Sequence, residues 1–225
     1  MLYRLVTSAL FAGFAAGLIA ALLQLAFVQP HLLHAEMFES GALTHSVTAG
    51  SLTHGPAYEF DAMRDVLSVL FSALIYVGYG LMLVAGMAFA SERGHVITAR
   101  SGIIWGLAGF IAVHFAPAIG LPPELPGSSA ADVGARQIWW FSTVGATALA
   151  LWLIAFGRSM ISWGVAAVLL AAPHIIGAPH PEKFHGGVPP ELAGLFASNA
   201  MGVGMAAWVV LGLLAAHFWN QEEGI

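Results

Sequence analysis

Histidine is the residue type of this sequence best suited to chemistry, because the chain has ten histidines and no cysteine. Imidazole and carboxylate ligands suit Co²⁺, Ni²⁺ and Zn²⁺, whereas the absence of thiolates disfavours a copper(I) or iron–sulfur site. With the N-terminus inside and six membrane crossings, most of the histidines share the outer side: His31, His34, His45, His54, His114, His174, His180 and His185. This grouping predicts a site that receives a metal ion. His95 and His217 fall on the opposite side, without acidic residues arranged around them as a site.

The first group of candidate ligands follows the first apolar stretch of the chain. Residues 30–39 could form a short helix at the membrane interface, and a spacing of three would then place His31 and His34 on one face. Glu36 adds a carboxylate, and His54 follows in the same loop. We predict metal contact by these four side chains. The alternative is that they are solvated loop residues.

A second group is denser. His174, His180 and His185 lie with Glu182 within twelve residues, and three prolines, Pro173, Pro179 and Pro181, precede or interrupt this segment. Prolines restrict the chain, so the three imidazoles could converge on one cation with a smaller loss of conformational entropy than in a free loop. The spacing matches no established zinc motif, which makes the pattern suggestive rather than diagnostic.

Four further polar residues lie in or near apolar stretches. A titratable side chain within a membrane span is costly and is functional by default, so we expect His114 and Glu124 to belong to the entrance of a metal pathway. The alternative for His114 is a buried histidine satisfied by a backbone carbonyl. Gln24 and Asn199 could line the pathway or could simply bond one helix to another.

The elements that would position these residues are membrane-spanning helices. The chain is 59% hydrophobic and 8% charged, with a mean hydropathy of +0.82, which a water-soluble domain of 225 residues could hardly bury. The predicted fold class is therefore all-α, a polytopic membrane helix bundle forming one domain over residues 1–225. We expect five to six segments: Leu5–Val28, Val66–Ala90, Ile103–Ala118, Ile138–Phe156, Ile161–Ala172 and Leu195–Phe218. The fifth is short and precedes Pro173, so it could be tilted, broken or re-entrant.

The positive-inside rule favours an internal N-terminus by a narrow margin. Four cations then lie inside, namely Arg4, Arg93, Arg100 and Arg158, against Arg64, Arg136 and Lys183 outside. Two Gly-x-x-x-Gly pairs, Gly13 with Gly17 and Gly102 with Gly106, predict close helix packing.

Several of these segments together resemble the CbtA family, a predicted cobalt transporter subunit. The resemblance covers nearly the whole chain and is carried by residues 3–17, 29–36, 54–56, 114–126 and 178–192. It implies a protein of the bacterial inner (plasma) membrane that supplies cobalt for cobalamin synthesis and works with a small, single-span, histidine-bearing subunit, CbtB. Family descriptions favour five spans rather than six. An odd number would move the last loop, with its histidines, relative to the first.

Transport of a divalent cation, most simply Co²⁺ uptake, is therefore the expected function, with no permanently bound cofactor and no enzymatic activity. Ni²⁺ and Zn²⁺ fit the same ligands. No Walker motif is present, which argues against ATP hydrolysis by this chain. Two alternatives stay open. A haem-binding electron carrier would need two span histidines at one depth, and an intramembrane metal-dependent hydrolase would hold its metal and activate water, although the sequence lacks His-Glu-x-x-His.

Overall fold

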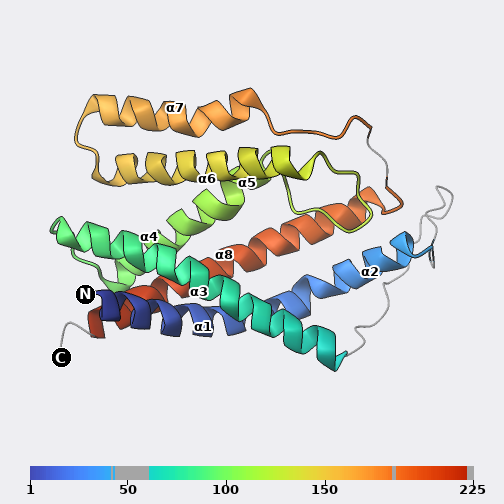
Figure 1. The fold of residues 1–225 in the computed structure, drawn as a ribbon, viewed down its shortest axis with the longest axis horizontal. Helices are drawn as coiled ribbons and strands as arrows, with labels where there is room; N and C mark the ends of the chain where they lie inside the picture. Colours follow the sequence, from blue (N-terminus) through green and yellow to red (C-terminus); the bar gives the residue numbers. More distant parts are fainter. Residues whose placement is uncertain (42, 44–60, 184–185, 222–225) are drawn as a thin grey trace. The chain divides into compact units, whose positions relative to one another are not determined.

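The computed structural model describes residues 1–41, 43, 61–183 and 186–221. His45, His54 and His185 lie outside the described residues. Every regular element within the described ranges is helical, which confirms the all-α prediction. In chain order the elements are α1 (Leu2–Phe27), α2 (Gln29–Glu39), α3 (Ala62–Glu92), α4 (Ala99–Phe110), the π-helix η1 (Ile111–Phe115), α5 (Ala116–Ala118), α6 (Val133–Phe156), α7 (Met160–Ile176) and α8 (Pro190–Gln221) (Figure 1).

Within the described ranges, five helical stretches are long and apolar enough to cross a membrane. They are Leu2–Phe27, Ala62–Glu92, Ala99–Ala118, Val133–Phe156 and Pro190–Gln221. Side-chain caps set the starts of two of these helices, α3 and α6, and of the shorter α7. The side chains of Asp61, Asp132 and Ser159 each accept a hydrogen bond from the backbone N–H three residues later, which satisfies an otherwise unpaired donor of α3, α6 and α7.

The short fifth segment forms one unbroken helix. α7 has 17 residues and includes Pro173, so the break that its proline made possible does not occur. Pro173 lies in the last turn of α7, where its missing N–H costs the helix one hydrogen bond, to the carbonyl of Leu169. Gly177, with a φ of 86°, then ends the helix in a conformation that favours glycine. At 1.5 Å per residue α7 is about 25 Å long, slightly less than the ~30 Å hydrocarbon core.

The chain divides into two compact units. Unit 1 comprises Met1–Gln29, Tyr58–Phe110 and Gly202–Ile225, and unit 2 comprises Pro30–Ala57 and Ile111–Met201. Unit 1 contains α1, α3, α4 and the C-terminal part of α8, and unit 2 contains α2, η1, α5, α6, α7 and the N-terminal part of α8.

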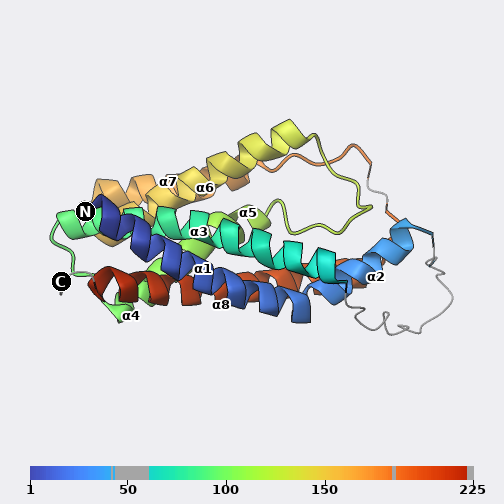
Figure 2. The ribbon, with the colours of Figure 1, turned by 60° about the horizontal axis from the view of Figure 1, so that its bottom comes forward.

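Glycines set the packing of unit 1. α1 crosses α3 in direct contact (Figures 1 and 2), and a Cβ added at Gly13 or Gly17 would lie 2.5 Å from the Cα of Val77 or 2.6 Å from that of Ala73. Gly102 approaches Gly212 of α8 in the same way. Both predicted Gly-x-x-x-Gly pairs therefore lie at close helix contacts, as small residues do where van der Waals packing drives association in a membrane.

Unit 2 is built on an antiparallel pair of helices. α7 turns back along α6 after a tight connection at Gly157 (Figures 1 and 2). At the far end of this pair a small apolar cluster joins three segments: Ala35 of α2, Leu125 of the loop after α5, and Leu192 at the start of α8 are all buried. Three segments that carry candidate ligands, namely α2, the loop after α5 and the first part of α8, thus meet at one cluster.

Candidate functional site

His31 forms the most specific contact among the candidate ligands. Its Nε2 lies 3.0 Å from Nδ2 of Asn199, in a partly buried contact between α2 and α8. The Asn199 amide also donates to the carbonyl of Leu195, one turn earlier in its own helix. Since that amide nitrogen can only donate, His31 Nε2 accepts from it, and the proton of the neutral ring is then on Nδ1.

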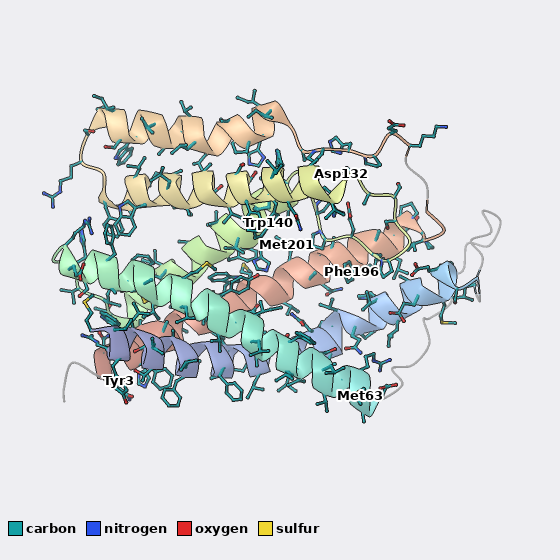
Figure 3. The ribbon with its side chains drawn as sticks, in the orientation of Figure 1. Tyr3, Met63, Asp132, Trp140, Phe196 and Met201 are labelled. Carbon is teal, nitrogen blue, oxygen red and sulfur yellow. The ribbon has the colours of Figure 1, made fainter. Side chains whose placement is uncertain are left out.

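His34 lies one turn further along α2. Its Nε2 is buried and has no hydrogen-bond partner among the residues that the structure describes, while its ring packs against Phe38 at a centroid distance of 5.4 Å. The apolar cluster around Ala35 adjoins it, with Phe38 and Phe196 packed on the cluster (Figure 3 labels Phe196). A buried imidazole nitrogen without a partner is a destabilising arrangement that a ligand would relieve.

His114 lies in a π-helical turn. The turn, η1, interrupts the span Ala99–Ala118 and carries His114 as its fourth residue. Short π-helical turns within α-helices occur frequently at functional sites, because the additional residue redirects side chains and frees backbone groups. The π-helical turn is thus a second reason, besides its place within a membrane span, to expect a functional role for His114.

His174, near the end of α7, packs against Trp139 of α6. The Trp139 indole N–H donates to the Pro173 carbonyl over 3.1 Å, and its ring meets the His174 ring edge-on at 6.1 Å. Gly120 is part of the same contact, because a Cβ there would lie 2.7 Å from Cβ of Ala178 and 2.8 Å from the Trp139 ring. The end of the His114-bearing segment thus packs directly against the segment that leads from His174 to the exposed His180.

The carboxylates differ from one another in their surroundings. Glu124 pairs with Arg136 at 2.7 Å, so the predicted ligand is partly neutralised by a cation. Glu36 is exposed on α2. Glu39, on the same helix, lies against Gly127 of the loop that carries Glu124.

These positions remain separate. Among the described residues, no three His, Asp or Glu side chains are close enough together to hold a metal ion jointly. In this part of the chain the candidate site consists of single histidines and of the pair formed by His31 and Asn199. Single and paired ligands suit brief contacts with a passing ion better than permanent coordination by four ligands.

Two polar residues of unit 1, Gln24 and Asp65, accept hydrogen bonds from other side chains. Gln24, a predicted pathway residue, accepts a hydrogen bond from Ser72 over 3.1 Å and so joins α1 to α3. Asp65, which the sequence argument did not select, is 4% exposed and receives hydrogen bonds from Gln29 and Arg64. Its position directly before the apolar run that starts at Val66 is a signal that could have identified it.

A sequence model of the CbtA family, described as a probable cobalt transporter subunit, matches residues 2–220 of the 225 residues. The chain belongs to the CbtA family. No curated protein and no solved structure matches it. Family membership and the five apolar helices together identify an integral membrane protein with a transport role connected to cobalt. CbtA is described as a subunit, which implies that it acts with a partner, and as part of a transporter, which favours a non-enzymatic role.

Proposed function

We propose that this CbtA family member takes up Co²⁺ across the bacterial inner membrane for cobalamin synthesis, with its N-terminus in the cytoplasm. The observation that carries the proposal is His114, a titratable residue on a π-helical turn within a membrane span. Polar residues in spans mark ion pathways, and imidazole is a suitable ligand for Co²⁺.

The outer end of the pathway would contain the remaining candidate ligands. His31, His34 and Glu36 on α2, with His54 in the loop that follows, would capture the ion. His174, His180 and His185 would form a second capture segment, and Glu124 would exchange its Arg136 partner for the cation. The contact of Gly120 with Trp139 and Ala178 supports transfer from this second segment to His114, because it joins the two segments directly.

Transfer inward would follow the electrical gradient. A doubly charged ion gains ~4.6 kcal/mol per 100 mV on entering, from ~2.3 per charge. Asn199 and Gln24 would offer polar contacts during the descent. A small single-span subunit carrying histidines, like CbtB, would be the partner that the family description implies. Ni²⁺ and Zn²⁺ are the competing ions, since the same ligands accept them.

Cobalt uptake in cells tests the proposal. The chain would be expressed with and without the partner subunit, and radioactive Co²⁺ accumulation would be measured at matched membrane expression. Replacing His114, His174 and His180 together by alanine should lower uptake by at least about tenfold, because even an outer partner of a metal ligand typically contributes 10- to 100-fold.

The matched control replaces His95 and His217, which lack a predicted role. His217 contacts only Gln221 of its own helix among the hydrogen bonds described for it. We expect this double variant to keep its uptake. Unchanged uptake in the triple variant would contradict the proposed pathway.

A further inference from the structure

A cavity lies at the end of unit 1 that contains the start of α1. Its volume is about 700 Å³, within the ~300–1,000 Å³ range of small-molecule sites. Three helices of the same unit line it, through Met1, Tyr3, Arg4, Ala88, Ser91, Glu92 and Trp219 (Figure 3 labels Tyr3). None of these residues belongs to the candidate metal site.

Arg4 provides a cation at a defined position on the cavity wall. Its Nε donates to the carbonyl of Trp219 over 2.8 Å, and the guanidinium carbon lies 3.9 Å from the centre of the Trp219 ring. Trp219 is only 2% exposed and so provides a rigid support. A guanidinium held over an aromatic ring loses little further freedom when it binds a phosphate, which its planar donors suit.

The wall contributed by α3 carries negative charge, in contrast to the cation of Arg4. Glu92 is the last residue of α3 and Ser91 precedes it, so a carboxylate coincides with the negative end of the helix dipole. A cation is favoured at such a helix end. Glu92 is exposed and takes part in no ion pair described in the structure. The cavity wall therefore carries one cationic and one anionic side chain, Arg4 and Glu92.

The surroundings indicate a lipid rather than a soluble ligand. The cavity lies at the ends of membrane-spanning helices, and Tyr3 and Trp219 are the aromatic types that gather at membrane interfaces. Leu2 and Phe89, next in sequence to lining residues, are 75% and 45% exposed and offer apolar surface to acyl chains.

We propose that this cavity binds the headgroup of phosphatidylethanolamine, with the phosphate on Arg4 and the ammonium group on Glu92. Phosphatidylglycerol carries the phosphate without an ammonium group, so Glu92 would gain no partner and would repel the net negative charge. Phosphatidylcholine carries a methylated ammonium group that cannot donate a hydrogen bond to Glu92. Recognition therefore requires both charges and the free ammonium.

Lipid titrations of the purified, delipidated full chain test this assignment. Native mass spectrometry would follow binding of dioleoyl-phosphatidylethanolamine, -phosphatidylglycerol and -phosphatidylcholine. We expect phosphatidylethanolamine to bind about tenfold more tightly than the other two, as a charge-assisted hydrogen bond predicts. Arg4→Gln should weaken its binding about tenfold, and Glu92→Gln should remove its advantage over phosphatidylglycerol.

Arg93→Gln is the matched control. Arg93 directly follows Glu92, but its guanidinium lies over the Phe89 ring of its own helix and does not line the cavity. Since Arg4 also supports Trp219, the exposed Glu92 provides the decisive variant if Arg4→Gln does not fold. Equal phosphatidylethanolamine binding by the Glu92→Gln and Arg93→Gln variants would overturn the proposal, as would tighter binding of phosphatidylglycerol by the unaltered chain.

Soluble O-phosphoethanolamine separates a lipid site from a site for a free phosphorylated amine. It presents the same two charges without acyl chains, so we expect no displacement of the lipid at micromolar concentrations. Displacement in that range would overturn the assignment to a lipid.

Discussion

At the residue scale, the contact between His31 and Asn199 bears most directly on ion capture. A histidine that ligates a metal generally has a partner that fixes its ring, and Asn199 holds the His31 ring through Nε2. A metal at Nε2 would have to replace Asn199, whereas a metal at Nδ1 would leave the contact intact but require loss of the ring proton. Asn199 is thus either a ring-orienting partner or a group that the ion displaces.

Asn199→Ala separates these two roles. If Asn199 orients His31, its loss should raise the KM for Co²⁺ uptake about twofold to tenfold, as expected for one hydrogen bond of ~0.5 to 1.5 kcal/mol. If the ion displaces Asn199, the KM should fall instead. Initial uptake rates over a range of Co²⁺ concentrations provide the measurement.

Ser198→Ala is the control for that variant, because Ser198 is adjacent, exposed, and bonded to the Leu195 carbonyl of its own helix. Its KM should stay within about twofold of the unaltered chain. If both variants gave the same KM, neither role of Asn199 in capture would hold.

The sequence identified several of these residues but not their arrangement. His31 and Asn199 were predicted separately, as a ligand and as a pathway residue, and 168 positions separate them. Local spacing cannot reveal such a contact, because it depends on how α2 packs against α8. Local sequence likewise gives no sign that the Trp139 indole bonds the Pro173 carbonyl near the end of α7 and packs against His174.

At the element scale, glycine pairs determine how closely the helices of unit 1 approach. The sequence predicted close packing at Gly13 and Gly17 from their spacing. It could not name α3 as the partner, because a small-residue face is compatible with several helices. The partner is specified by steric fit, with Gly13 against Val77 and Gly17 against Ala73.

Gly13→Ala tests the importance of this contact. The new methyl group would meet the Val77 Cα at 2.5 Å, so the helices must separate. We expect a loss of ~1 to 3 kcal/mol in the free energy of unfolding, typical of overpacking. Thermal unfolding of the purified chain in detergent would show this as a fall in Tm of several degrees.

Gly78→Ala is the matched control within α3. Nothing lies within 4 Å of a Cβ added there. Alanine should therefore leave Tm unchanged or raise it slightly, since glycine within a helix is less favourable by ~0.5 to 1 kcal/mol. Equal Tm values for the two variants would show that the α1–α3 contact does not limit stability.

At the scale of the whole molecule, hydrophobicity alone was sufficient to predict the membrane class and the position of the long helices. The observed helices begin before the expected segments, as in α3, which begins four residues before Val66. Polar caps such as Asp61 extend a helix beyond its apolar run, so hydropathy underestimates helix length. The π-helical turn around His114 has no hydropathy signal and could not have been predicted in this way.

The sidedness of the loops depends on α7. Within unit 2, α7 returns to the end where α6 begins, as the Trp139 contact with Pro173 requires. If both helices cross the bilayer, Ser128 and Glu182 share one side, and Ser159 lies on the other. The proposed orientation makes the side of Ser128 and Glu182 the outer one.

Cysteine labelling can determine on which side of the membrane each loop lies, because the chain has no cysteine of its own and each introduced thiol is unique. Ser128→Cys and Glu182→Cys should react in intact cells with a membrane-impermeant maleimide. Ser159→Cys and Val96→Cys should react only after permeabilisation. Ser159 lies in the turn between α6 and α7 and Val96 in the connection between α3 and α4, and both connections are expected inside. All four positions avoid the arginines that govern orientation, and Ser128, Glu182, Ser159 and Val96 are exposed. Labelling of Glu182→Cys only after permeabilisation would mean that α7 does not cross, and it would separate His174 and His180 from the outer ligands of α2.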